Sequence, residues 1–189
     1  YVSSKGFTLF EISIFMVSIS SFGALAQWPI GYVSDKIDRR IILIAITFIA
    51  AGLSIFIVIS SYLSFILFII LSGIFSAMSL PMFSVAVAHV NDFLESNEII
   101  SASSTFNILI GIGSILGPIL VSSSMTLVGP NGFFIYLFLV HGALGLFGLY
   151  RMARRVKPHD LESQYIPLPR NISAAGMEMN PVIEPTQED

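Results

Sequence analysis

The stretch QWPIGYVSDKIDRR at residues 27–40 joins a long uncharged run to a short, densely charged segment. Five of the six positions from 35 to 40 are charged, whereas residues 12–34 and residues 41–91 contain no Asp, Glu, Lys or Arg. Charged side chains are costly inside a lipid bilayer, and basic residues gather in loops beside membrane spans. The pattern therefore predicts a short loop between two membrane-spanning helices.

The rest of the chain has the composition of a membrane protein. Of its 189 residues, 54% are hydrophobic and 11% are charged, with a mean hydropathy of +0.85, whereas soluble domains have about 25% charged residues. A hydrocarbon core about 30 Å thick needs about 20 apolar residues per helix, and continuous apolar runs favour helices over barrel strands. Turn-forming residues divide the longer runs at 60–64 and 128–132. The sequence predicts an all-α, polytopic membrane protein with five spans, near residues 9–33, 41–59, 64–90, 99–127 and 132–152.

The basic residues predict the orientation of these spans. With five spans, the loops at 35–40 and 91–98 share one side of the membrane with the C-terminal tail. The basic residues near the spans on that side are Lys36, Arg39, Arg40, Arg151, Arg154, Arg155 and Lys157. Because the other side has only Lys5, the positive-inside rule places the charged loops in the cytoplasm and the start of this chain outside. An outer start without a signal peptide predicts at least one helix upstream of this chain.

The last part of the chain differs in composition. Residues 158–189 contain five of the nine prolines and few large apolar residues. Such a segment cannot bury enough surface to fold. We therefore predict a transmembrane domain at 1–157 and a disordered cytoplasmic tail at 158–189. The tail is interpreted as a natural C-terminus, with a linker after a sixth helix as the alternative.

The segment Gly31–Arg40 resembles the signature loop of the major facilitator superfamily (MFS). The loop has a Gly, an Asp four residues later, then a basic residue and a basic pair. Lys36 stands where Arg is usual and Asp38 where Gly is usual, which predicts a different turn because Asp tolerates left-handed backbone less well. The segments 27–31 and 88–92 are similar to a bacterial branch of this superfamily with mostly unassigned substrates, which implies a location in a bacterial inner membrane. The resemblance covers residues 7–152 and implies half of a twelve-helix bundle.

This resemblance implies a gating loop that acts as a cytoplasmic latch during alternating access. Its residues in this chain are Gly31, Asp35, Lys36, Arg39, Arg40 and Asp92. We expect Gly31 to allow a close backbone approach and Asp35 to cap a helix N-terminus. The basic pair can reach three acids on the same side, which are Asp92, Glu95 and Glu98. The alternative is that these basic residues are ordinary topology anchors.

The spans also indicate which half of a transporter this chain forms. The third span lacks the intramembrane Arg of a proton-coupled first half and has small residues at Gly73 and Ala77 instead. The fourth span contains Gly113-x-x-x-Gly117-Pro118, which partly resembles a motif of efflux antiporters but lacks its following Gly pair. The best match is helices eight to twelve, a C-terminal half without its first helix. Helices two to six are the alternative.

Three polar residues inside the spans are the candidate substrate contacts, namely Gln27, Asn107 and His141. Polar groups at membrane depth normally face a bundle interior or a water-filled cavity. His141 lies near mid-membrane and could relay a proton, or it could be a packed histidine that donates to a backbone carbonyl. Gln27 and Asn107 could instead join helices by hydrogen bonds. Glu11 with Thr8 predicts a capping box at the start of the first span.

These observations predict a secondary active transporter of a small molecule, with proton-coupled efflux as one mode. Its expected partners are the small-molecule substrate, the lipid bilayer and the other half of the transporter, and no cofactor or metal is expected. A non-transporting receptor or scaffold of the same architecture is the alternative. An enzyme is disfavoured because the chain has no Gly-x-Ser-x-Gly pattern and no intramembrane cluster of His and carboxylates. Nucleic-acid binding is disfavoured by the net charge of -3.

Overall fold

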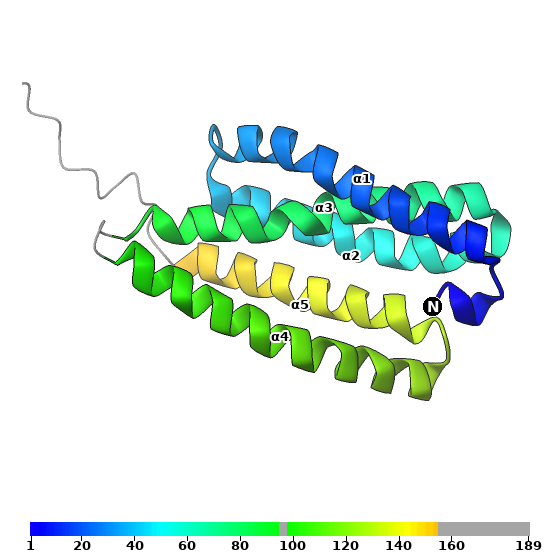
Figure 1. Cartoon of the computed structure of the whole chain (residues 1–189). Helices are drawn as coiled ribbons and strands as arrows, with labels where there is room; N and C mark the ends of the chain where they lie inside the picture. Colours follow the sequence, from blue (N-terminus) through cyan, green and yellow to red (C-terminus); the bar gives the residue numbers. More distant parts are fainter. Residues whose placement is uncertain (95–97, 155–189) are drawn as a thin grey trace, which may run out of the picture. The chain divides into compact units, whose positions relative to one another are not determined.

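A computed structural model describes residues 1–94 and 98–154 of the chain as a helical bundle (Figure 1). A short 3-10 helix, η1, precedes the five α-helices α1 (Leu9–Ser34), α2 (Arg39–Leu63), α3 (Phe65–Asn91), α4 (Ile99–Val128) and α5 (Gly132–Arg154). All five are long and apolar enough to cross a membrane. The predicted all-α, multi-pass architecture is confirmed, and the tail predicted at 158–189 lies outside the described residues.

A capping box explains where α1 begins, and a glycine explains the turn between α4 and α5. At the start of α1, the Thr8 Oγ1 accepts from the Glu11 N–H at 3.3 Å, and Glu11 Oε2 accepts from the Thr8 N–H at 2.8 Å, so the predicted capping box is present. Between α4 and α5, Gly129 has a φ of 81°. Because glycine adopts positive φ at low cost, the chain reverses there, as predicted from 128–132.

The turn between α2 and α3 is shorter than predicted, so the predicted limits at 60–64 were wrong. Helix α2 continues to Leu63, and only Ser64, with a φ of -160°, leaves helical geometry before α3 begins. The Ser60 and Ser61 hydroxyls donate to the carbonyl oxygens of Ile57 and Val58 at 2.9 and 2.8 Å. Serine can therefore remain in a helix by bonding to the preceding turn, and its turn propensity is overridden.

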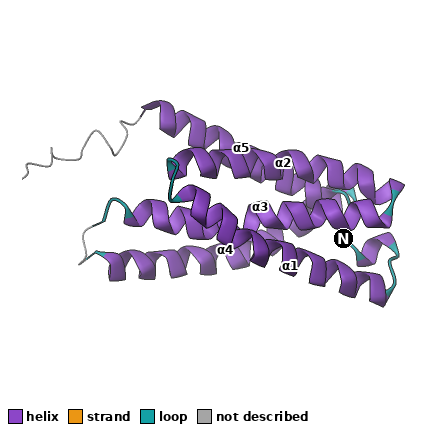
Figure 2. Cartoon of the chain, turned by 90° about the horizontal axis from the view of Figure 1, so that it is seen from above, coloured by secondary structure: helices purple, strands orange, loops and turns teal. Residues whose placement is uncertain are grey.

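Helix α3 is central to the packing of residues 1–154. It packs against α1 and α2, while α2 also packs against α5, and Figures 1 and 2 show this arrangement from two directions. Small residues allow the close approach: a Cβ added at Gly73 of α3 would lie 2.9 Å from the Phe22 ring of α1. In the same way, a Cβ at Gly145 of α5 would lie 2.9 Å from Phe48 of α2. Glycine is thus used as in other membrane bundles to bring helices together.

Helix α4 is the least packed of the five. It lies along α5 and touches α3 through Phe106 and Phe83, whose rings are 6.3 Å apart. None of its residues is buried. An apolar helix with so little buried surface is stable only against lipid or against protein that completes the bundle.

Candidate functional site

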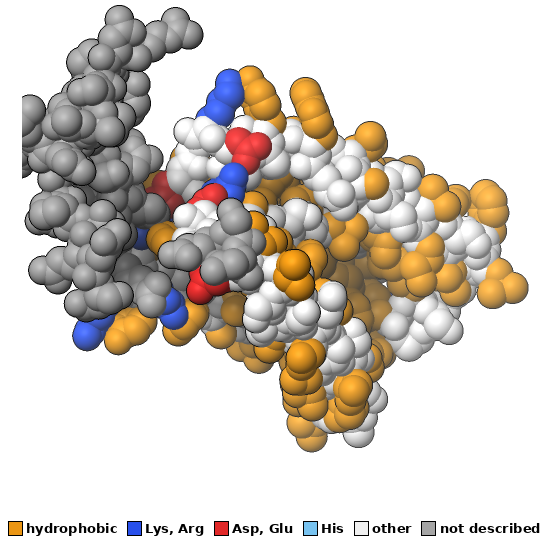
Figure 3. Space-filling model, turned by 60° about the vertical axis from the view of Figure 1, so that its left-hand side comes forward, with side chains coloured by type: hydrophobic (Ala, Val, Ile, Leu, Met, Phe, Trp, Pro, Cys, Tyr) orange, Lys and Arg blue, Asp and Glu red, His pale blue; other side chains and the backbone are white. Residues whose placement is uncertain are grey.

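Charged residues gather at one end of the helices. The α1–α2 turn, the end of α3, the start of α4 and the end of α5 meet there (Figure 1). Figure 3 shows the red and blue side chains at this end, with hydrophobic side chains over much of the remaining face. The predicted sharing of one side by the loops at 35–40 and 91–98 therefore agrees with the arrangement of the described helices.

Arg39 bridges two helix ends at this site. Its Nη2 lies 2.8 Å from Asp35 Oδ1, and its Nη1 lies 2.7 Å from Asp92 Oδ1. Asp35 and Asp92 are the C-cap residues of α1 and α3, and Arg39 is the first residue of α2. A single guanidinium therefore ties three helices together, and it offsets the unfavourable placement of a carboxylate at each helix C-terminus.

The cap of α2 differs from the prediction. Asp35 ends α1, and the residue that caps α2 is Asp38, whose carboxylate accepts from the Arg40 N–H at 3.0 Å. An N-cap must directly precede the first helical residue, and α2 begins at Arg39. Asp38 has a φ of -49°, so the position where Gly is usual in the superfamily loop has no left-handed backbone here.

Arg40 forms its ion pair within the same turn. Its Nη2 lies 2.7 Å from Asp38 Oδ2, and its Nε also donates to this carboxylate. The hydrogen bonds from the Arg40 side chain hold the pKa of Asp38 below its ordinary value. Of the acids predicted to meet the basic pair, Asp92 meets Arg39, and Glu95 lies outside the described residues.

Asp38 provides a prediction for stability. Asp38→Ala removes the cap and the ion pair and is expected to lower the free energy of unfolding by about 1 kcal/mol, whereas Asp38→Asn keeps a cap acceptor and loses less. Because the folded-state pKa is lowered, the contribution of Asp38 is complete above the pKa of an unfolded aspartate and is lost as pH falls through the folded pKa. Unfolding curves of both variants at neutral and acidic pH test this, and equal losses in the two variants would contradict it.

Gly31 lies in the last turn of α1, and Lys36 lies within the α1–α2 turn. A Cβ added at Gly31 would meet nothing within 4 Å among the described residues, so the predicted close approach is not observed. Lys36 has its Nζ 4.1 Å from the centre of the Tyr32 ring and donates to the Tyr32 hydroxyl. Unlike Arg39, Lys36 makes no ion pair with the acids in the described ranges.

His141 is packed between α5 and α3. Its side chain is buried, with Nδ1 2.8 Å from the Leu137 carbonyl oxygen and Nε2 3.3 Å from Ser79 Oγ. The carbonyl oxygen can only accept, so Nδ1 carries the proton and Nε2 accepts from the serine. The ring also meets Phe75 edge-on at 5.4 Å. This is the geometry of the packed histidine, and its partner Ser79 was missed because the two residues are far apart in the sequence.

Gln27 and Asn107 are exposed on different helices. Neither side chain makes a hydrogen bond to the part of the protein that the structure describes, so the predicted helix-joining role is not observed there. Gln27 lies seven residues before the end of α1, and Asn107 lies eight residues after the start of α4. At 1.5 Å per residue, both lie roughly 10–12 Å from the charged end. The hydrogen bonds of His141 go to Leu137 and Ser79 and not to either of these residues.

Each of these two residues belongs to a stripe of small or polar residues. The α1 stripe consists of Ser13, Ser20, Ala24 and Gln27, and the α4 stripe consists of Ser104, Asn107, Gly111, Ser114 and Pro118. The spacings of three, four and seven place each set on one helix face, and all of these residues are exposed. Membrane helices use such faces to contact other helices or to line an aqueous cavity.

A second polar cluster lies at the opposite end of the bundle. The Tyr62 hydroxyl accepts from Asn131 Nδ2 at 2.8 Å, and Lys5 Nζ lies 3.7 Å from the centre of the Tyr62 ring. Tyr1 donates to Ser61 Oγ at 2.9 Å. These contacts connect η1, the end of α2 and the α4–α5 turn. The sequence does not indicate these contacts, because the residues come from three separate segments.

Comparison with known proteins decides the family. The family model of the Major Facilitator Superfamily matches residues 1–174. The chain belongs to the Major Facilitator Superfamily. This confirms the resemblance inferred from the loop at 31–40, and the Arg39 cluster is therefore built on a superfamily loop.

Curated relatives in the superfamily are similar over part of their length. The chain is 27% identical over 137 residues to the uncharacterized MFS-type transporter YcaD of Escherichia coli O139:H28, of strain HS and of strain K12 / DH10B. The match covers 72% of this chain and 35% of each relative, so it spans about a third of the curated relatives' length. No solved structure matches the chain.

Proposed function

We propose that this chain is part of a secondary active transporter that moves a small molecule across a bacterial inner membrane by alternating access. The observation that carries the proposal is Arg39, which joins the ends of α1 and α3 through Asp35 and Asp92. Membership in a transporter superfamily and relatives named as transporters support it. The excess of basic residues at this end supports a cytoplasmic location for the cluster.

The cluster is proposed to act as a latch for the cytoplasmic end. The Arg39 side chain is 21% exposed, while that of Asp35 is 65% exposed. Asp35 can therefore accept a further donor from the other half of the transporter while it remains paired with Arg39. The latch would favour the state in which this end is closed, because ties between helix ends are lost when the ends separate.

Gln27 and Asn107 are the proposed substrate contacts. Both are exposed at the same depth on small or polar faces, which supports a surface turned toward the rest of the transporter. A substrate held there would lie between the two halves. In the transporter that contains this chain, reconstituted in proteoliposomes, a panel of small solutes should include at least one that shows protein-dependent flux.

Two variants test the substrate contacts, and flux through the unaltered protein separates a transporter from a receptor or scaffold. Gln27→Ala and Asn107→Ala are expected to raise the KM for the transported solute, because each removes a polar partner of the substrate. Ser104→Ala, on the same α4 face but nearer the end of the helix, serves as the control and should leave KM within about twofold. Solute binding without flux through the unaltered protein would favour the receptor alternative.

His141 is proposed to position α5 on α3 rather than to relay protons. Both ring nitrogens already have protein partners, so Nε2 could take up a relayed proton only if the Ser79 hydroxyl turned to accept from it. His141→Asn is expected to leave the pH dependence of transport unchanged and to reduce stability by about 0.6 kcal/mol for the lost interhelical bond. A pH profile that becomes flat in this variant would restore the relay, and Ser79→Ala should show the same small loss of stability.

The five helices are proposed to be helices eight to twelve of a twelve-helix transporter. The absence of Arg from α3 supports this assignment. The lack of buried residues on α4 and the exposed stripe on α1 support a further helix that packs beside them. Single cysteines introduced on α4 and on this further helix of the transporter would be tested for crosslinking. The chain suits this test because its sequence contains no cysteine.

A further inference from the structure

Helix α1 has two exposed faces near its charged end, and they differ in character. One is the small and polar stripe that includes Gln27. The other carries Leu25, Trp28 and Tyr32, which are 76%, 79% and 53% exposed. Because consecutive residues of an α-helix are turned by about 100°, Trp28 and Gln27 point in clearly different directions. The two faces therefore point mainly in different directions, and they adjoin where Trp28 follows Ala24 by four residues.

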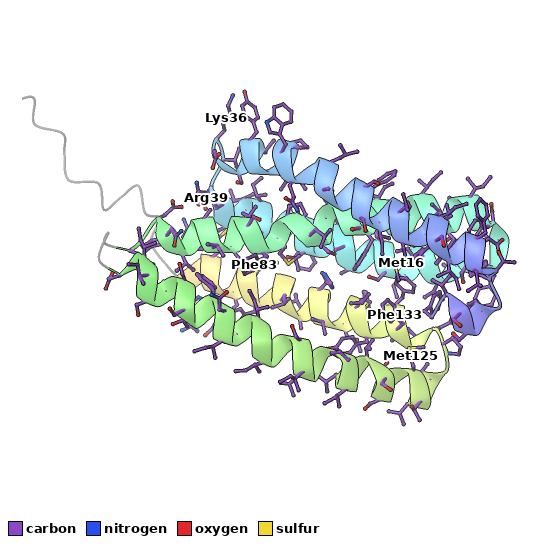
Figure 4. The ribbon with its side chains drawn as sticks, in the orientation of Figure 1. Met16, Lys36, Arg39, Phe83, Met125 and Phe133 are labelled. Carbon is purple, nitrogen blue, oxygen red and sulfur yellow. The ribbon has the colours of Figure 1, made fainter. Side chains whose placement is uncertain are left out.

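The apolar face ends in an ordered stack of three side chains. The Trp28 and Tyr32 rings are stacked with their centres 6.1 Å apart and an interplanar angle of 20°. Lys36 Nζ lies 4.1 Å from the centre of the Tyr32 ring and donates to its hydroxyl oxygen. Successive members are four residues apart, with Trp28 and Tyr32 in α1 and Lys36 in the turn that follows it. Lys36 projects from the α1–α2 turn away from the helices, while Arg39 lies toward α3 (Figure 4).

Lys36 forms no ion pair with an acid in the described ranges. Asp35 and Asp92 pair with Arg39, and Asp38 pairs with Arg40, whereas Lys36 has no acidic partner in residues 1–94 and 98–154. Its ammonium instead lies over an aromatic face, where cation–π attraction holds it. The Tyr32 hydroxyl accepts from Lys36 and can still donate its own hydrogen. The stack thus offers a positive charge and an O–H donor at the same point.

We propose that Trp28, Tyr32 and Lys36 form a binding site for the phosphate headgroup of an anionic phospholipid. Lys36 supplies the charge, the Tyr32 hydroxyl donates to a phosphate oxygen, and Trp28 with Leu25 contacts the first part of an acyl chain. The position of these residues at the end of a membrane span suits this ligand. Trp and Tyr prefer the headgroup region, and basic residues beside a span attract anionic lipid. The site does not use the contacts of Arg39 with Asp35 and Asp92, on which the proposed latch rests.

Lipid fits this face better than a partner helix does. Helix contacts in membranes are rich in small residues that allow close approach, and those residues lie on the other exposed face of α1. A stacked Trp and Tyr would hold a neighbouring backbone away. The Lys36 ammonium, which forms no ion pair in the described ranges, also complements an anionic headgroup, whereas a zwitterionic headgroup has no net charge to match it.

Trp28 makes the proposal directly measurable, because it is the only tryptophan in the sequence. We would reconstitute the protein in phosphatidylcholine bilayers that contain an equal fraction of either brominated phosphatidylglycerol or brominated phosphatidylcholine, and measure quenching of Trp28 fluorescence. Any tryptophan outside this sequence would be replaced by phenylalanine. We expect an apparent preference of about fivefold for phosphatidylglycerol, the factor that about 1 kcal/mol per basic residue gives.

Matched variants assign the preference to Lys36. Lys36→Gln is expected to abolish it, Lys36→Arg to retain it, and Lys5→Gln, at the opposite end, to leave it unchanged. High salt should reduce it in the unaltered protein, since screening weakens the attraction. Equal quenching by both lipids, or a preference that survives Lys36→Gln, would overturn the proposal. Absence of quenching by either lipid would also overturn it, because protein would then cover this face.

Discussion

Arg39→Gln is expected to reduce transport by about tenfold while the protein still inserts into the membrane. The substitution removes both bonds of the bridge, to Asp35 at 2.8 Å and to Asp92 at 2.7 Å. Partly exposed ion pairs are worth up to about 1 kcal/mol each, and a loss of about 1.4 kcal/mol changes an equilibrium tenfold. The closed, latched state would therefore lose most of its free-energy preference over the open state. The transport cycle would then stall in the open state.

A double-mutant cycle tests whether the bridge is the cause. If Arg39 acts through Asp92, the variant that combines Arg39→Gln with Asp92→Asn should transport no worse than Arg39→Gln alone. Arg39→Lys keeps the charge but cannot hold two carboxylates in the fork geometry of a guanidinium, so an intermediate flux is expected. Lys5→Gln at the other end is the control. Normal flux in Arg39→Gln would reject the latch and leave the basic residues as topology anchors.

Phe68→Ala is expected to destabilise the bundle by about 3–5 kcal/mol. Phe68 is fully buried near the η1 end of the bundle. Its ring stacks on Phe15 at 5.3 Å and on Phe7 at 5.7 Å, and meets Phe134 edge-on at 6.5 Å. Removing it would leave a cavity among α1, α3 and α5 that lipid cannot enter, so the packing contacts would be lost outright.

Phe56→Ala is the matched control for this prediction. Phe56 lies on α2 and is 60% exposed, so the same chemical change there removes few protein contacts. We expect its effect on the free energy of unfolding to stay below about 1 kcal/mol. Unfolding titrations in mixed detergent micelles would compare the two variants. Similar losses would show that the aromatic cluster around Phe68 does not stabilise this bundle.

The spans could be predicted because the bilayer imposes a simple requirement on sequence. Runs without charge had to contain whole helices, and the predicted limits lie within a few residues of those observed, except at 60–64, where α2 continues to Leu63. Turn propensity alone could not show that Ser60 and Ser61 bond back within the helix. The α4–α5 turn was predictable because Gly129 and Pro130 rarely continue a helix.

The candidate site was predictable in part. The pairing of Arg39 with Asp92 followed from topology, since both lie on the same side of the membrane. The cap was assigned to Asp35 instead of Asp38 because the sequence does not fix where α2 begins to within three residues. The Ser79 partner of His141 depends on how α3 and α5 face each other, which periodicity does not specify.

The most direct test of the latch is the accessibility of Asn107 from the cytoplasmic side. Asn107→Cys would be made in the protein that contains this chain, with any cysteine outside this sequence replaced by serine. A membrane-impermeant maleimide would then be applied to inside-out vesicles. If Arg39 keeps this end closed, adding Arg39→Gln should raise the labelling rate about tenfold, the factor expected for the lost ion pairs. An unchanged labelling rate would contradict the account.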